Sequence, residues 1–146
     1  MKLSKLTDYG VVLLSFLAAS PDKSKSAASL ADETGIPGPT VAKLMKMLAR
    51  SGLVTSTRGI AGGYALANQA DQISVACIIG AIEGPIALTA CVEESEDDCS
   101  VESTCGVAGN WDSVNAAVKA ALQNVKLTDM TPDWRTMFPE PQKEFA

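Results

Sequence analysis

The sequence contains no histidine among its 146 residues. This absence excludes mixed histidine–cysteine zinc sites, Ser–His or Cys–His nucleophilic pairs, and imidazole general bases. Glycine-rich phosphate loops of the Walker or dinucleotide type are also missing. We therefore expect a protein that is not an enzyme.

Aromatic residues and long apolar runs are scarce as well. Aromatics make up 5% of the chain and hydrophobic residues 47%, so the core must be built from Ala, Leu, Val and Ile. No run approaches the roughly 18 uncharged apolar residues that a membrane span needs. The short apolar run at 11–19 follows Asp8 and has no cleavage site, which argues against a signal peptide. We expect a cytoplasmic protein without a membrane segment.

The net charge of −5 is unevenly divided along the chain. Residues 1–68 hold eight Lys and Arg against four Asp and Glu, a net +4. Residues 69–146 hold four Lys and Arg against 13 acids, a net −9. DNA affinity depends on the local neutralisation of phosphates, so a basic module joined to an acidic one is compatible with nucleic acid.

Three helices are predicted in the first half, each delimited by a capping residue or a helix breaker. The first begins at a cap on Thr7 or Asp8 and runs to about residue 19. The second covers 27–33, and the third covers about 39–51. A short turn with two glycines joins the second helix to the third, which is typical of a helix-turn-helix.

The third predicted helix has two different faces. Its apolar positions recur at steps of three and four: Val41, Leu44, Met45 and Leu48. Its basic residues lie on the other side: Lys43, Lys46 and Arg50. This pattern indicates a helix that packs one face into a core and offers the other to the major groove of DNA.

A β-hairpin is predicted directly after this helix. Residues 52–56 and 64–67 read as short strands, and 57–63 form a turn with Arg58 at its base. The glycines of the turn allow positive φ angles and a close approach to a phosphate. A basic helix followed by such a hairpin predicts a winged helix-turn-helix.

These elements predict a double-stranded DNA operator as the partner of the first half. Thr40 and Lys43 would face base edges or phosphates, and Lys46 is better placed for the phosphate backbone. Arg58 would reach the adjacent minor groove or a phosphate. For any single lysine, a solvated surface charge is the alternative. The candidate DNA-binding residues are Pro39, Thr40, Lys43, Lys46, Arg58, Gly62 and Gly63.

Three of the four cysteines lie in a polar segment that follows a helix predicted over 73–83. Acidic residues separate Cys91, Cys99 and Cys105, so we expect a loop there. Structural disulfides are unusual in cytoplasmic proteins, and three buried apolar cysteines do not fit acidic neighbours. Thiolates suit zinc, Cu(I) and iron–sulfur clusters. The wide, irregular spacing differs from the paired C-x2-C loops of zinc ribbons and slightly favours a cluster over zinc. Cys77 lies in an apolar helix and is expected in the core.

A long helix is predicted over about 110–125. Its apolar stripe has helical spacing: Trp111, Val114, Val118, Ala121, Leu122 and Val125. The stripe would pack on its own domain or on a second copy. Because helix-turn-helix proteins usually bind DNA as dimers, we interpret this helix as the contact of a homodimer.

The expected fold class is mainly α with a small β-hairpin wing: a winged helix-turn-helix followed by a long C-terminal dimerisation helix. Three parts are predicted. Residues 1–68 form the DNA-binding module, 69–130 hold the cysteine loop and the dimerisation helix, and 131–146 form a flexible tail.

Taken in order, these motifs resemble the Rrf-type winged-helix transcription regulators, which include IscR-like and NsrR-like branches. The matching stretches are residues 5–9 near the N-terminus, residues 52–54, the wing at 58–64, the three-cysteine loop, and residues 127–130. The stretches 83–91 and 105–111 look closest to the regulators of SUF-type iron–sulfur cluster assembly.

The resemblance implies that Cys91, Cys99 and Cys105 ligate a [2Fe–2S] or [4Fe–4S] cluster. The IscR branch completes its ligand set with a histidine after the third cysteine, but Ala108 stands at that place here. In the NsrR branch an aspartate of the partner subunit serves instead, and Asp8 matches its position. Asp8 is therefore the candidate fourth ligand, and loop acids such as Glu102 are weaker candidates. Its alternative role is a helix cap or a first-turn acid that complements the helix dipole.

The resemblance also implies a function: a homodimeric, DNA-binding regulator that senses iron–sulfur cluster status and controls SUF-type assembly genes. The alternative is a cluster-free thiol or zinc sensor that acts as a redox-sensing repressor on the same fold. A third interpretation is an interaction module whose wing binds protein and never DNA.

Overall fold

The computed structural model describes residues 2–60 and 62–131. The tail predicted at 131–146 lies, apart from Thr131, outside these residues. Helices predominate, and one two-stranded antiparallel hairpin accompanies them. The predicted fold class, mainly α with a β-hairpin wing, is confirmed.

The first half contains three helices and the hairpin. They are α1 (Lys5–Ala19), α2 (Ala27–Thr34), α3 (Gly38–Arg50), β1 (Val54–Thr57) and β2 (Gly63–Leu66). In the hairpin Val54 pairs with Leu66 and Thr57 with Gly63. The strands therefore begin and end within two residues of the predicted ranges.

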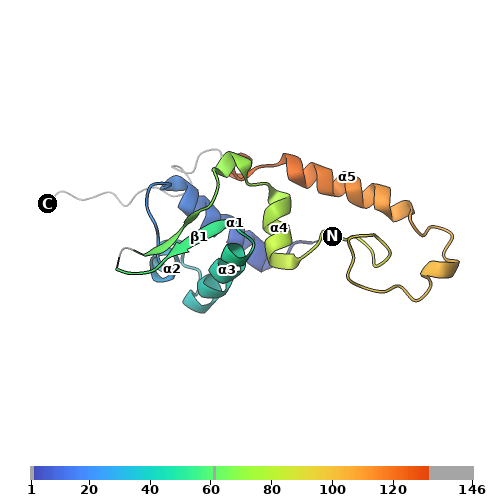
Figure 1. Cartoon of the computed structure of the whole chain (residues 1–146), viewed down its shortest axis with the longest axis horizontal. Coiled ribbons are helices and arrows are strands. Elements are labelled where there is room, and N and C mark those ends of the chain that lie inside the picture. The colour runs from blue at the N-terminus through green and yellow to red at the C-terminus, as the bar shows by residue number, and fades with distance from the viewer. Residues whose placement is uncertain (1, 61, 132–146) are drawn as a thin grey trace.

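The second half is helical around a long irregular loop. It comprises the short 3-10 turn η1 (Ala70–Gln72), α4 (Val75–Glu83), the 3-10 turn η2 (Glu102–Thr104), α5 (Asn110–Asn124) and α6 (Leu127–Met130). Within the described residues, no helix is both long and apolar enough to span a bilayer. Figure 1 shows α1 to α4 and the hairpin gathered into one body, from which α5 extends to the loop.

Buried aliphatic side chains from α1 to α4 and from β1 form the core, and Leu66 of β2 packs against it. The side chains with no exposed surface include Leu13, Leu14, Leu30, Leu44, Leu48 and Ile78. Each fully buried side chain of this size contributes roughly 1.5–3 kcal/mol relative to an exposed one. The helix-turn-helix is thus held as a rigid unit by apolar packing.

The start of α1 differs from the prediction. Ser4, rather than Thr7 or Asp8, caps the helix, because its Oγ accepts the Thr7 N–H at 3.3 Å. Asp8 therefore lies inside the first turn, where a carboxylate complements the helix dipole. The cap interpretation of Asp8 is wrong, whereas its interpretation as a first-turn acid is confirmed.

The prediction for Cys77 is also wrong. Its side chain is exposed, because α4 turns Val75, Ile78 and Ile79 toward the protein and Cys77 away from it. The Ser74 hydroxyl donates to Cys77 Sγ at 3.2 Å. An apolar sequence around a residue on a short helix did not by itself specify which face was buried.

The C-terminal end of α5 is fixed to the body by backbone hydrogen bonds. Val75 N–H donates to Val125 O at 2.8 Å, and Leu127 N–H donates to Ile73 O at 2.8 Å. These bonds place the end of α5 beside the start of α4 (Figure 1). The opposite end of α5 leads into the cysteine loop.

Candidate nucleic-acid interface and cysteine loop

Helix α3 presents its basic residues to solvent, as its sequence predicts. Val41, Leu44, Met45 and Leu48 are fully buried, whereas Lys43, Lys46 and Arg50 are exposed. At the start of the helix Pro39 is exposed and Thr40 half-buried, and no side chain caps the first turn. Free N–H groups at a helix start are ready donors for a phosphate.

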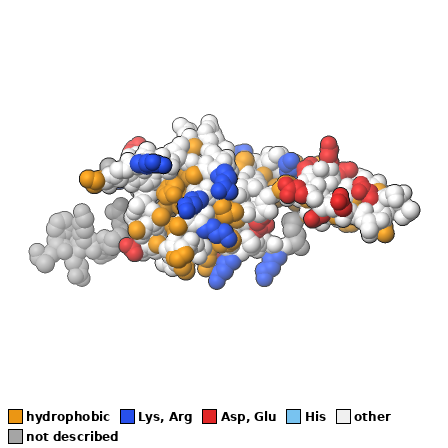
Figure 2. All heavy atoms as spheres, turned by 60° about the horizontal axis from the view of Figure 1, so that its bottom comes forward, with side chains coloured by type: hydrophobic (Ala, Val, Ile, Leu, Met, Phe, Trp, Pro, Cys, Tyr) orange, Lys and Arg blue, Asp and Glu red, His pale blue; other side chains and the backbone are white. Residues whose placement is uncertain are grey.

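Figure 2 shows the charge division in space. Lys and Arg side chains gather over the body, while Asp and Glu side chains crowd the arm that carries the cysteine loop. The uneven charge seen along the sequence is therefore also a separation between two surfaces. A polyanion would approach the body and be repelled by the arm.

The tip of the wing is open to solvent. Arg58 is exposed, and so is Ile60. Gly59 has a φ of 109°, a backbone conformation that other residues rarely adopt. The turn thus brings Arg58 to the surface, where it is free to reach a phosphate.

The two remaining wing glycines have steric roles inside the protein. A Cβ on Gly62 would collide with the carbonyl oxygen of Thr57 across the turn. A Cβ on Gly63 would lie 2.6 Å from the carbonyl carbon and oxygen of Lys25. Both glycines are therefore required for the shape of the wing, independently of any contact with DNA.

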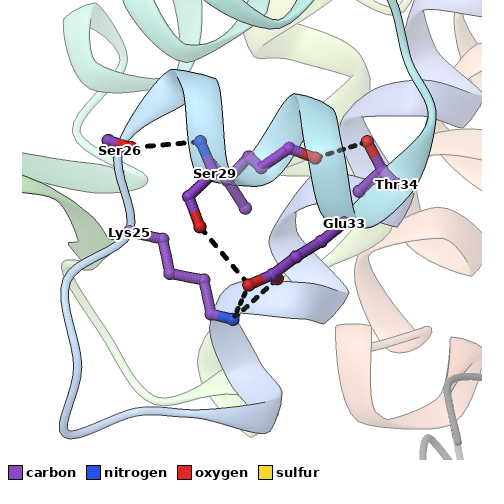
Figure 3. A network of polar contacts seen from close by, with 6 residues as sticks. Lys25, Ser26, Ser29, Glu33 and Thr34 are labelled. Atoms are coloured by element: carbon purple, nitrogen blue, oxygen red, sulfur yellow. Dashed lines mark hydrogen bonds and ion pairs between the residues drawn. The ribbon is translucent and has the colours of Figure 1, made fainter. Parts of the chain in front are cut away.

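Lys25 joins the wing to α2, a contact that the sequence did not reveal. Its backbone pairs with Tyr64 through two hydrogen bonds of 2.9 and 2.7 Å. Its Nζ lies 2.7 Å from Glu33 Oε2, next to the Ser29 hydroxyl (Figure 3). Lys25 is thus a structural cation, in contrast to the exposed lysines of α3.

The cysteine loop connects α4 to α5. Cys91, Cys99 and Cys105 are half-buried free thiols. Thr89 Oγ1 lies 3.2 Å from Cys91 Sγ. In the part of the chain that the structure describes, no three Cys, Asp or Glu side chains are arranged to hold a metal ion. The three thiols share one loop but do not form a ligand set in this conformation.

Asp8 is exposed on the first turn of α1. It borders an open cavity of about 500 Å³ whose lining is Lys2, Leu3, Ser4, Lys5, Thr7, Asp8, Val11, Val75 and Met130. The structure does not place Asp8 in a group with the cysteines of its own chain.

Glu83 ties the start of α1 to the end of α4. Its Oε1 accepts the Ser4 N–H at 2.6 Å and the Thr7 hydroxyl at 2.7 Å. The Thr7 hydroxyl, and then the Ser4 backbone, hold the pKa of Glu83 below its ordinary value. An acid in the last turn of a helix opposes the helix dipole. The unfavourable position of Glu83 in the last turn of α4 is therefore the feature of the sequence that could have indicated a stabilising partner from another element.

Comparison with known proteins identifies the family to which this chain belongs. The family model Rrf2, described as "Iron-dependent Transcriptional regulator", matches residues 3–133. The chain belongs to the Rrf2 family. It is therefore a transcription regulator rather than an enzyme, as the sequence predicted.

Individual relatives of this Rrf2 chain agree with the assignment. An HTH-type transcriptional regulator of Synechocystis sp., slr0846, is 34% identical over 137 residues, which cover 93% of this chain and 91% of the relative. The structure of IscR from T. potens has a TM-score of 0.65 at 30% identity, with 94% of this chain and 90% of that chain covered. The structure of CymR, the global cysteine regulator of B. subtilis, has a TM-score of 0.65 at 28% identity, with 90% and 97% covered.

Proposed function

We propose that this Rrf2 regulator senses iron–sulfur cluster status and controls genes of SUF-type cluster assembly from the cytoplasm. The observation that carries the proposal is the set of three free, half-buried thiols on the loop between α4 and α5. Among the comparisons, the likeness to IscR supports it.

The donor set fits an iron–sulfur cluster. Cys91, Cys99 and Cys105 supply three thiolates, the ligands that iron in such clusters prefers. A bound cluster would supply a crosslink that oxidation or iron shortage can remove. The hydrogen bonds that surround Cys99 and Cys105 are local to the loop. Closure of this part of the loop around a ligand would therefore break no described hydrogen bond to a helix of the body.

A fourth ligand is proposed from a second copy of the chain. Asp8 is exposed, and the apolar face of α5 is incompletely covered, with Trp111 41% and Val114 43% exposed. A homodimer that packs the α5 faces of two subunits together would cover Trp111 and Val114. It would also bring Asp8 of one subunit toward the cysteine loop of the other. The Glu83 contacts would then hold the helix that carries Asp8 in place.

The DNA-binding surface of each subunit in the dimer would consist of α3 and the wing. In α3, the first turns hold Pro39, Thr40 and Lys43 and would enter the major groove, and Lys46 lies one turn further along. Arg58 would contact the backbone or the minor groove beside the wing glycines, Gly62 and Gly63. The two DNA-binding surfaces of the dimer would bind half-sites about 34 Å apart on duplex DNA.

The alternative function is a cluster-free sensor that represses transcription and responds to thiol oxidation or zinc. The likeness to CymR favours it, because that relative is named for cysteine regulation. The free thiols are also half-exposed, so oxidants can reach them.

Anaerobic purification tests the two functions. A cluster predicts a brown protein with visible absorption and equal iron and sulfide, which Cys99→Ala abolishes and Asp8→Ala alters. Cys77→Ala is the matched control, since Cys77 lies outside the loop, and it leaves the spectrum unchanged. A colourless protein with zinc, or with no metal and with thiol-dependent DNA binding, would establish the alternative. An unchanged spectrum in Asp8→Ala would remove only the fourth-ligand assignment.

A further inference from the structure

Helix α5 buries an amide where its sequence offers apolar side chains. Asn115 is the buried residue of this helix, with no exposed surface, whereas Trp111 and Val114 are exposed. Burying a polar side chain costs free energy unless its hydrogen bonds are made. The contacts of Asn115 therefore identify what this part of α5 holds.

Asn115 binds the backbone of the segment that leads to Cys91. Its Oδ1 accepts the Leu88 N–H at 2.9 Å. Its Nδ2 donates to Ile86 O at 2.8 Å and to Glu94 Oε2 at 3.3 Å. An amide side chain has both a donor and an acceptor, so it pairs with a peptide chain as a neighbouring strand would.

Two further residues on the same face of α5 reinforce this grip. Asp112 Oδ1 accepts the Glu93 N–H at 3.2 Å, and Lys119 Nζ lies 3.9 Å from Glu94 Oε1. Positions 112, 115 and 119 share one helix face, at steps of three and four residues. We call Asp112, Asn115 and Lys119 the clasp.

The clasp divides the cysteine loop into two parts. Residues 86–94, which include Cys91, are bound to α5 by the clasp. Beyond them, the described hydrogen bonds of residues 97–108 join partners no more than three positions apart, such as Glu102 N–H to Cys99 O. Cys99 and Cys105 therefore lie in a part of the loop that has only local support.

We propose that Asn115 is a positioning residue for the cysteine site: it fixes Cys91 against α5 as the preset thiol onto which the rest of the loop closes. The inference rests on the proposed function only for the identity of the ligand. The clasp face begins one residue after the Trp111 and Val114 face, so the two lie about 100° apart around α5. The helix that would meet a second copy is thus also the helix that holds Cys91.

The test measures thiol reactivity in the metal-free full-length protein. Each cysteine is alkylated with iodoacetamide under native conditions, and its rate is followed by peptide mass spectrometry. Asn115→Ala should raise the rate at Cys91 about fivefold or more, because buried hydrogen bonds that restrain the segment are lost. Cys99 and Cys105 should change less than about twofold, since local bonds already govern their opening.

Asn124→Ala is the matched control, because it makes the same change at an exposed position of α5. It should leave all three rates unchanged. Asn115→Asp should give an intermediate rate at Cys91, since a carboxylate still accepts from Leu88 N–H but no longer donates to Ile86 O. Asp112→Ala, at an exposed position, should give a smaller increase at the same cysteine.

Circular dichroism and thermal unfolding show whether each variant is folded. If Asn115→Ala unfolds, Asp112→Ala and Asn115→Asp decide the question. Equal rates at Cys91 in wild type and folded variants would overturn the proposal, and so would an equal rise at all three cysteines. A selective rise at Cys91 in a protein that never carries a cluster would uphold the clasp and refute the proposed function.

Discussion

The body and the arm of this protein are ordered by different interactions. The body, residues 2–60, 62–83 and 125–131, closes around leucines with no exposed surface, such as Leu13, Leu14 and Leu44. In the arm, residues 84–124, only Val92 and Asn115 are buried. Apolar burial therefore holds the body, and a few polar contacts hold the arm.

This difference would suit the proposed sensor, in which a ligand on the arm alters DNA binding by the body. A rigid core keeps α3 and the wing in fixed relation, which two-site recognition of DNA requires. Because little apolar surface is buried in the arm, we expect it to open locally at a lower free energy than the core, so the proposed ligand on its thiols could reorder it.

Core truncation should give the largest effect. Leu44→Ala removes a fully buried side chain from α3 and should lower the free energy of unfolding by roughly 2–5 kcal/mol. Val101→Ala in the arm, where the side chain is 57% exposed, should change it by less than about 0.5 kcal/mol. Urea unfolding followed by circular dichroism measures both. Similar losses for the two variants would contradict the division into body and arm.

Much of the body could be predicted from the sequence, because helical periodicity and burial coincide there. The apolar positions of α3 are the buried ones, and its lysines are exposed. The errors arose where a local pattern had two solutions. Several hydroxyl and carboxylate residues at the start of α1 could act as a cap, and Ser4 does. The apolar surroundings of Cys77 did not specify which side of α4 faces the core.

The arm was less predictable, because its order depends on contacts between distant residues. Asn115 reads as a surface residue of an amphipathic helix, and only the backbone of 86–88 explains its burial. The closeness of Gly63 to Lys25 likewise needs the three-dimensional path of the chain. The sequence was sufficient to single out the three loop cysteines as candidate ligands. In the described residues, however, their side chains are not gathered around a common ligand position.

The packing of the wing on the body gives a second, smaller effect. Gly63→Ala places a carbon against the Lys25 carbonyl, so the wing must shift, and stability should fall by roughly 1–3 kcal/mol. Gly80→Ala is the matched control in α4, where the added carbon meets open space, and should be neutral or stabilise by up to about 1 kcal/mol. Urea unfolding compares the two. Equal stability in both variants would show that the wing moves freely relative to Lys25.

The basic body and the acidic arm should differ in DNA binding. Lys43→Ala removes a candidate phosphate or base contact, so affinity for promoter DNA should fall by roughly 1 kcal/mol and the slope against log salt by about 1. Lys119→Ala, in the arm, should leave that slope unchanged. Fluorescence anisotropy across a salt series measures both. A slope lowered by Lys119→Ala and not by Lys43→Ala would move the interface to the arm.

The smallest effect concerns Glu83, where the body meets the arm. Its pKa is lowered in the folded protein, chiefly by the Thr7 hydroxyl, so its ionised form stabilises the fold above the ordinary value of 4.5 and this contribution disappears as pH falls through the folded value. Because the carboxylate is exposed, Glu83→Gln should cost less than about 1 kcal/mol at pH 7, and less still in acid. Unfolding in urea at several pH values measures the difference. In a Thr7→Val background the pH-dependent part should shrink, and a difference that persists at full size would assign the stabilisation to another partner.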